Sequence, residues 1–151
     1  MPSKNLLKVV VLVIVIVVIG VGASFYLSNT TNTKLPVINT TVLGSKVDLS
    51  NRALNSIPVD ILRPGIEILD LSNNNLESLP SQIETWTSVR ELYLYNSNLN
   101  SIPAEIGRLR KLEILDASDN NITCIPAEIG NLSNLKTLDL SNNGITDIPE
   151  E

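Results

Sequence analysis

The chain opens with a long apolar run that carries no charge. Val9 to Ile19 is an unbroken series of Val, Leu and Ile, and apolar or small residues continue to Leu27. A helix rises about 1.5 Å per residue and a bilayer core is roughly 30 Å thick. The pattern therefore predicts one transmembrane helix over residues 9–27.

The charges around this run predict its orientation. Lys4 and Lys8 precede it, and the next positive charge is Lys34. Because positive residues favour the cytoplasmic side, we expect residues 1–8 in the cytoplasm and the rest outside, as a single-pass signal anchor. A second interpretation stays open: a secretory signal cleaved at Val21-Gly22-Ala23, which releases the remainder as a secreted protein. In both cases the C-terminal part leaves the cytoplasm.

Residues 28–45 are rich in Asn and Thr and predict a polar linker. Its few apolar residues are candidates for a cap that folds back onto the following domain: Val37, Ile38, Val42 and Leu43.

From residue 46 the apolar positions recur every 22 or 23 residues. Each repeat has a triplet with apolar first and last positions, then an apolar residue five positions on, then Ile or Leu followed by Pro. Within a triplet such as Leu69-Asp70-Leu71, alternation with period two predicts a short strand whose leucines face inward. The proline predicts a turn or short helical segment on the return. One repeat cannot bury its apolar face alone, so stacking into a solenoid is expected.

The spacing L-x-x-L-x-L-x-x-N-x-L occurs at Ile66–Leu76, Leu112–Ile122 and Leu135–Ile145. It resembles the leucine-rich repeat, in the 23-residue class of Ras-suppressor-like and plant intracellular Ras-group-related proteins. The resemblance implies an α/β fold over residues 46–151: a leucine-rich repeat solenoid of about five repeats, the last incomplete. Short parallel strands would form a concave sheet, and the convex side would be irregular or short helical.

An asparagine column follows the predicted strands at Asn74, Asn120 and Asn143, with Arg52 and Ser97 in the other two repeats. Amides both donate and accept, so we expect them to satisfy backbone groups inside the turn. Ser97 is shorter and is expected to weaken this ladder.

The outward strand positions are the candidate binding surface. The middle column reads Asp48, Asp70, Tyr93, Asp116 and Asp139, and Tyr95 replaces a serine found in the other repeats. The LDLS pattern by itself accounts for the acids, whereas both tyrosines depart from it at the centre. The predicted partner-binding residues are Tyr93, Tyr95, Asp70, Glu91, Asp116 and Asp139.

Composition narrows the chemistry. The chain has 151 residues, a formal charge of −5, no His and one Cys. These counts exclude His-dependent catalysis, an internal disulfide and multi-Cys metal sites. The acidic balance argues against nucleic acid as a partner. We expect no enzyme activity, no cofactor and no bound metal. The lone Cys124 is either a small loop residue or an intermolecular disulfide partner.

The sequence thus predicts a membrane-anchored binding module displayed outside the cytoplasm, whose concave face binds a protein or an envelope polymer. Its alternatives are a secreted adhesin or effector and an inert truncated repeat fragment. The chain stops in mid-repeat at Glu151 without a cap. That end leaves open a truncated product, an end-to-end dimer through the last repeat, or a marginal last repeat blunted by its terminal acids.

Overall fold

The computed structural model describes residues 14–18, 23–27, 41–43 and 45–149 of the chain. The chain divides into two compact units, Met1–Ile38 and Asn39–Glu151. In the first unit, β1 (Ile14–Val18) pairs antiparallel with β2 (Ala23–Leu27), and Ile16 lies opposite Phe25.

Over residues 14–18 and 23–27 these two strands stand where a helix over residues 9–27 was expected. The run is dominated by Val and Ile, whose β-branched side chains lose rotamer freedom in a helix and fit an extended, pleated backbone well. Residues 9–13 and 19–22 of the expected helix lie outside the described residues, as do residues 1–8 and 28–40. Within the described residues, the structure has no helix that is both long and apolar enough to cross a membrane.

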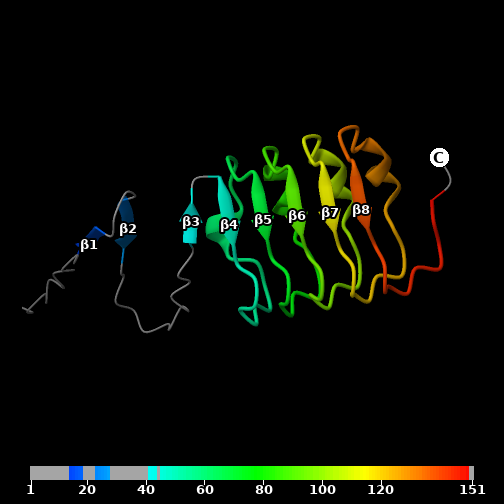
Figure 1. The fold of residues 1–151 in the computed structure, drawn as a ribbon, viewed down its shortest axis with the longest axis horizontal. Coiled ribbons are helices and arrows are strands. Elements are labelled where there is room, and N and C mark those ends of the chain that lie inside the picture. The colour runs from blue at the N-terminus through cyan, green and yellow to red at the C-terminus, as the bar shows by residue number, and fades with distance from the viewer. Residues whose placement is uncertain (1–13, 19–22, 28–40, 44, 150–151) are drawn as a thin grey trace, which may run out of the picture. The chain divides into compact units, whose positions relative to one another are not determined.

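The second unit is built on one six-stranded sheet in sequence order (Figure 1). Its first strand, β3 (Thr41–Leu43), runs antiparallel to the next, with Val42 opposite Val47. Part of the expected linker is therefore the edge strand of the sheet, while Val37 and Ile38 lie outside the described residues. The remaining strands are parallel to one another: β4 (Lys46–Asp48), β5 (Ile68–Asp70), β6 (Glu91–Tyr93), β7 (Ile114–Asp116) and β8 (Thr137–Asp139).

The returning segments on the convex side are short 3₁₀ helices, as the proline column predicts. Each helix directly follows a proline in extended conformation, because proline cannot donate an N–H and is best placed before or within the first turn. The helices are η1 (Val59–Ile61), η2 (Ser81–Thr85), η3 (Ala104–Arg108) and η4 (Ala127–Asn131), after Pro58, Pro80, Pro103 and Pro126. The parallel strands and short helical returns confirm the expected solenoid.

The core lies between the sheet and these helices. Leu69, Leu92 and Leu115, the middle residues of consecutive strands, are fully buried. Trp86 is also fully buried, and its Nε1–H donates to the carbonyl oxygen of Ile61 at 2.8 Å. The indole therefore fills the space beside the shortest helix and satisfies its own polar group at the same time.

Asn120 satisfies backbone groups of two consecutive repeats, as expected. Its Oδ1 accepts from the amides of Ser97 at 3.0 Å and Leu99 at 2.9 Å. Its Nδ2 donates to the carbonyls of Leu94 at 2.9 Å and Ala117 at 3.0 Å. These bonds tie neighbouring turns together where no strand ladder reaches.

Asn74 and Asn143 each make corresponding bonds to the repeat that precedes them. In the third repeat Ser97 takes over part of this role. Its Oγ donates to the carbonyl of Leu71 at 3.0 Å, and its own carbonyl accepts from the amide of Leu76 at 2.9 Å. The column therefore continues through the serine with fewer side-chain bonds.

Candidate binding face

The outward-facing columns are in register across the concave sheet. Asp70, Tyr93 and Asp116 are direct partners on β5, β6 and β7, and Asp139 follows Asp116 on β8. Adjacent strands lie about 4.8 Å apart, so Tyr93 is held between two carboxylates. The structure thus brings these predicted residues together, with Asp139 at the far edge of the row.

The aspartates of this row have a local structural role. Asp116 Oδ1 accepts from the backbone amide of Ser118 at 3.1 Å and from its hydroxyl at 2.7 Å. The same pair of hydrogen bonds recurs in each repeat that carries the Asp-x-Ser sequence: Asp48 with Ser50, Asp70 with Ser72, and Asp139 with Ser141. One carboxylate oxygen in each pair accepts both hydrogen bonds and so closes the turn after the strand. This structural role supports the interpretation that the aspartates belong to the LDLS repeat pattern.

The hydrogen bonds from serine also lower the pKa values of two of these aspartates. The Ser50 amide, followed by the Ser50 hydroxyl, lowers the pKa of Asp48. For Asp139 the order is reversed: the Ser141 hydroxyl lowers its pKa most, and the Ser141 amide comes second. Hydrogen bonds to a carboxylate favour its charged form, so both carboxyls resist protonation.

The repeat on β6 lacks these aspartate–serine hydrogen bonds, because Tyr93 and Tyr95 occupy the two positions. Their hydroxyl groups make other contacts. Tyr93 Oη donates to Glu91 Oε2 at 2.9 Å, and Asn73 Nδ2 donates to Tyr95 Oη at 3.0 Å. Both rings are partly exposed. Each ring is thus fixed at its hydroxyl end and presents area to solvent, which suits a contact surface because little side-chain entropy remains to be lost.

Burial raises the pKa of Tyr93, and the hydrogen bond to Glu91 and the charges of Glu91, Asp70 and Asp116 raise it further. These effects all act against a phenolate, since it would stand among like charges. Tyr93 is therefore a neutral hydroxyl surrounded by three carboxylates. A cationic group of a partner would be favoured at this position.

Two isoleucines border this acidic centre on the concave side. Ile68 and Ile114 pair in register with Glu91 from either side, and both are partly exposed. The face therefore combines two aromatic rings, two aliphatic side chains and carboxylates on consecutive strands. Aromatic side chains are enriched at protein-binding surfaces, whereas the charged groups of such surfaces lie mainly at the rim.

A ladder of ion pairs lies just before the strands, and its residues were not among those predicted from sequence. Glu113 forms ion pairs with Arg90 of the preceding repeat and with Lys136 of the following one, at 2.6 Å for the lysine. The hydrogen bond from Lys136, followed by the charges of Arg90 and Lys136, lowers the pKa of Glu113. The signal was present as charges of alternating sign, 23 residues apart.

Other chemistry is sparse in the described part of the chain. Cys124 is exposed and pairs through a single parallel bridge with Asp147. Over the same residues, no group of three or more Cys, Asp or Glu side chains is arranged to hold a metal ion.

Comparison with known proteins agrees with the geometry. A family model described as Leucine Rich repeats (2 copies) matches residues 110–150, and one described as Leucine rich repeat matches residues 64–122. No curated protein sequence matches the chain.

Two examples illustrate the similarity of this chain to solved structures. A leucine-rich repeat protein of Leptospira interrogans is 28% identical with a TM-score of 0.60, covering 70% of this chain and 33% of its own. The plant peptide hormone receptor RGFR1 in complex with RGF2 is 35% identical with a TM-score of 0.53, covering 60% of this chain and 15% of its own. This chain thus spans a third or less of either relative. With its parallel strands, asparagine column and family matches, the chain belongs to the leucine-rich repeat proteins.

Proposed function

We propose that this chain is a protein-binding module whose contact surface is the concave face around β6, with Tyr93 and Tyr95 as its anchors. The main support is the position of Tyr93, which lies in register between Asp70 and Asp116 and whose hydroxyl is hydrogen-bonded to Glu91. Both tyrosines replace residues that close the turn in the other repeats. These replacements remove the local hydrogen bonds and place two aromatic rings at the centre of the sheet. Tyrosine is enriched among the few residues that carry most of the binding energy of an interface.

The surrounding charges indicate the kind of partner. The concave centre carries carboxylates from three consecutive strands, flanked by Ile68 and Ile114. A partner segment with a basic side chain between aliphatic residues fits both features. The plant receptor that resembles this chain was solved in complex with RGF2, which is in keeping with a protein-binding role.

The test compares the full chain with the double variant Tyr93→Ala/Tyr95→Ala. Partners would be captured from surface-exposed proteins of the source cells, identified, purified and titrated by calorimetry. Loss of one anchor costs about 2 kcal/mol or more, so the double variant should bind at least roughly 30-fold more weakly. The matched control is Glu105→Ala on η3, on the convex side, which should bind as the unaltered chain does.

Equal affinity of the double variant and the unaltered chain would disprove the proposal. Thermal unfolding of each variant separates lost binding from lost fold. Failure of the correctly folded, unaltered chain to bind any surface protein would favour the inert fragment instead.

We further propose that residues 9–27 hold this module at a membrane, with residues 1–8 in the cytoplasm and the repeats outside. The support is the uninterrupted apolar run and the lysines before it. In water β-branched side chains favour strands, but a bilayer core requires each backbone polar group to be satisfied within the segment, which favours a helix. The extended strands β1 and β2 and a membrane helix would then be conformations in two different solvents.

Two measurements test the anchor. An alkaline carbonate wash of the membrane fraction should leave the chain in the pellet, and mass spectrometry of the mature protein should find the N-terminal residues intact. A mature chain that begins after Ala23 and is found in the medium would instead show cleavage and secretion.

A further inference from the structure

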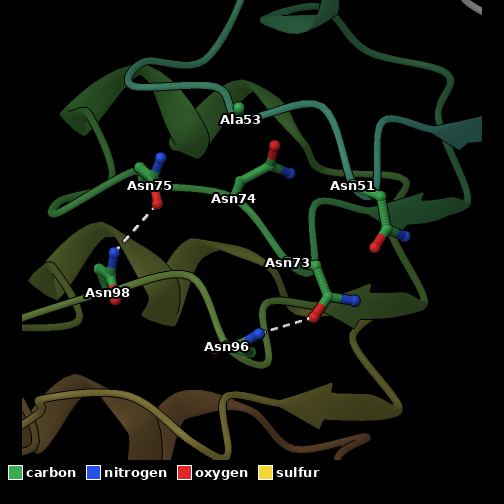
Figure 2. Close-up of a pocket in the computed structure, with 7 residues that line it drawn as sticks. All are labelled: Asn51, Ala53, Asn73, Asn74, Asn75, Asn96 and Asn98. Atoms are coloured by element: carbon green, nitrogen blue, oxygen red, sulfur yellow. Dashed lines mark hydrogen bonds between the residues drawn. The ribbon is translucent and has the colours of Figure 1, made fainter.

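A pocket of about 340 Å³ lies in the loops that follow β4, β5 and β6, and it is lined almost entirely by asparagine (Figure 2). The pocket is shallow and open to solvent, so it would contact one face of a small polar ligand and leave the other face in water. The lining residues are Asn51, Ala53, Asn73, Asn74, Asn75, Asn96 and Asn98. The wall therefore carries no charged side chain, although the repeat domain as a whole is acidic.

Side-chain amides form two short rows along the pocket. Asn96 Nδ2 donates to Asn73 Oδ1 at 2.8 Å, and Asn98 Nδ2 donates to Asn75 Oδ1 at 3.1 Å (Figure 2). Asn73 Nδ2 is held in turn by Tyr95 Oη. These bonds orient the amides, so the donors and acceptors that remain have fixed directions before a ligand arrives.

Backbone conformation explains only some of these asparagines. Asn tolerates positive φ better than most residues, and the left-handed region is occupied at Asn51, Asn73, Asn96 and Asn98. Ala53, however, adopts φ 50° without a polar side chain, and Asn75 does not have positive φ. Turn geometry therefore does not account for Asn75 in the second amide row, which leaves room for a recognition role.

The chemistry of the wall selects a class of ligand. An amide donates and accepts without net charge, and so does a hydroxyl. An anion would find no cationic side chain here, a metal ion no carboxylate, and an apolar ligand only Ala53. We propose that this pocket binds a neutral sugar unit of a glycan through Asn73, Asn75, Asn96 and Asn98. This site is separate from the protein contact proposed above and stands or falls independently.

The test follows the side-chain amide signals of the full chain by NMR. The protein is solubilised in a detergent without a sugar headgroup, because such a headgroup would compete. Glucose, galactose and N-acetylglucosamine are titrated to millimolar concentrations, with triglycine and sodium sulfate as probes of other chemistry. At least one sugar should shift the Nδ2 signals of Asn75 and Asn98, and the other two probes should not.

The variant Asn75→Ala/Asn98→Gly removes one amide row. Glycine accepts the positive φ of Asn98 without strain, so the loop keeps its shape. Loss of several hydrogen bonds should weaken sugar binding by about tenfold or more. The matched control is Asn142→Gly, which also has positive φ and donates to Asp119 Oδ1 at 2.8 Å, but lies outside the pocket. Its sugar affinity should be unchanged.

Three results would overturn the proposal. They are no shift with any sugar, shifts confined to residues outside the pocket, and a response to triglycine or sulfate in place of sugar. Equal weakening in Asn142→Gly and the double variant would likewise assign the effect to loop stability.

Discussion

The repeats on β7 and β8 have the same design and different surroundings. Leu115 and Leu138 occupy the same position of the triplet and pair with each other in register. Leu115 is fully buried, whereas Leu138 is 42% exposed, and Ile148 further along the last repeat is 72% exposed. In a solenoid each repeat buries its neighbour, so burial depends on the next repeat and not on the repeat's own sequence.

The largest expected effect is on the buried leucine of this pair. Leu115→Ala should lower the free energy of unfolding by about 2–5 kcal/mol, because it removes packing on both sides and leaves a cavity. Leu138→Ala should cost roughly 1 kcal/mol or less, because part of that side chain is already in water. Urea denaturation of the two variants measures the difference.

If both variants lost several kcal/mol of unfolding free energy, the contrast between the two leucines would be wrong, since Leu138 would then be covered in solution. Analytical ultracentrifugation distinguishes a second copy packed on β8 from burial within one chain. A dimer that dissociates on Leu138→Asp would assign that cover to the end-to-end contact.

The asparagine column gives the next largest contrast. Asn120→Ala leaves buried amides and carbonyls of two repeats without partners, so we expect a loss of roughly 2 kcal/mol or more in unfolding free energy. Asn143→Ala should cost roughly half as much, because its surroundings are more exposed and water replaces the lost bonds. Equal destabilisation in urea titrations would show that the last turn is as dry as the inner one.

A pair of glycines extends the comparison to the convex side and the loops. A Cβ at Gly107 on η3 would lie 2.6 Å from the Glu128 carbonyl oxygen of η4, whereas one at Gly144 would lie 3.8 Å from the nearest atom, the Ile122 carbonyl oxygen. Gly107→Ala should therefore destabilise the chain by about 1–3 kcal/mol and Gly144→Ala hardly at all. Calorimetric melting of both variants checks this, and an unchanged melting temperature for Gly107→Ala would contradict close stacking of η3 on η4.

The smallest expected effects are in the titration of the two end aspartates. Ser141→Ala removes the largest cause of the lowered pKa of Asp139, so that pKa should rise towards its ordinary value. Ser50→Ala should raise the pKa of Asp48 less, because the backbone amide that both variants keep is the largest cause of the lowered pKa at Asp48 and only the second largest at Asp139. Carboxyl ¹³C shifts followed against pH measure both values.

Because both pKa values are lowered in the folded chain, these groups stabilise it above their unfolded pKa. That stability is lost as the pH falls through the folded value. The serine variants should therefore lose less stability on acidification than the unaltered chain. A larger rise for Asp48 than for Asp139 would contradict the assigned order of donors.

Much of the repeat unit was predictable from sequence because its contacts lie a fixed distance apart along the chain. The inward leucines, the proline before each returning segment and the bonding of Asn120 to backbone groups of the turn follow from the repeat pattern. The register that places Tyr93 beside Asp70 and Asp116 follows for the same reason, since one repeat length sets it. Their location as a row was therefore visible in advance, while their role in binding remains a proposal.

Other features depended on side-chain partners that spacing does not specify. Tyr93 could have bonded to either flanking aspartate, and only the folded chain shows its hydroxyl on Glu91. The amide rows of the asparagine pocket likewise depend on which rotamers the loops allow. The strands β1 and β2 differ from the expected helix because an apolar run is compatible with both conformations, and the choice depends on its surroundings.

The sequence by itself determined the repeat length, the inward and outward columns and the charges placed on each, because local periodicity sets all three. Only the tertiary structure decided which copies of a shared residue are buried, which carboxylate oxygens accept hydrogen bonds from serine, and where asparagines from successive loops line an open pocket. These properties arise between repeats, and the same triplet acquires a different environment from each neighbour it meets.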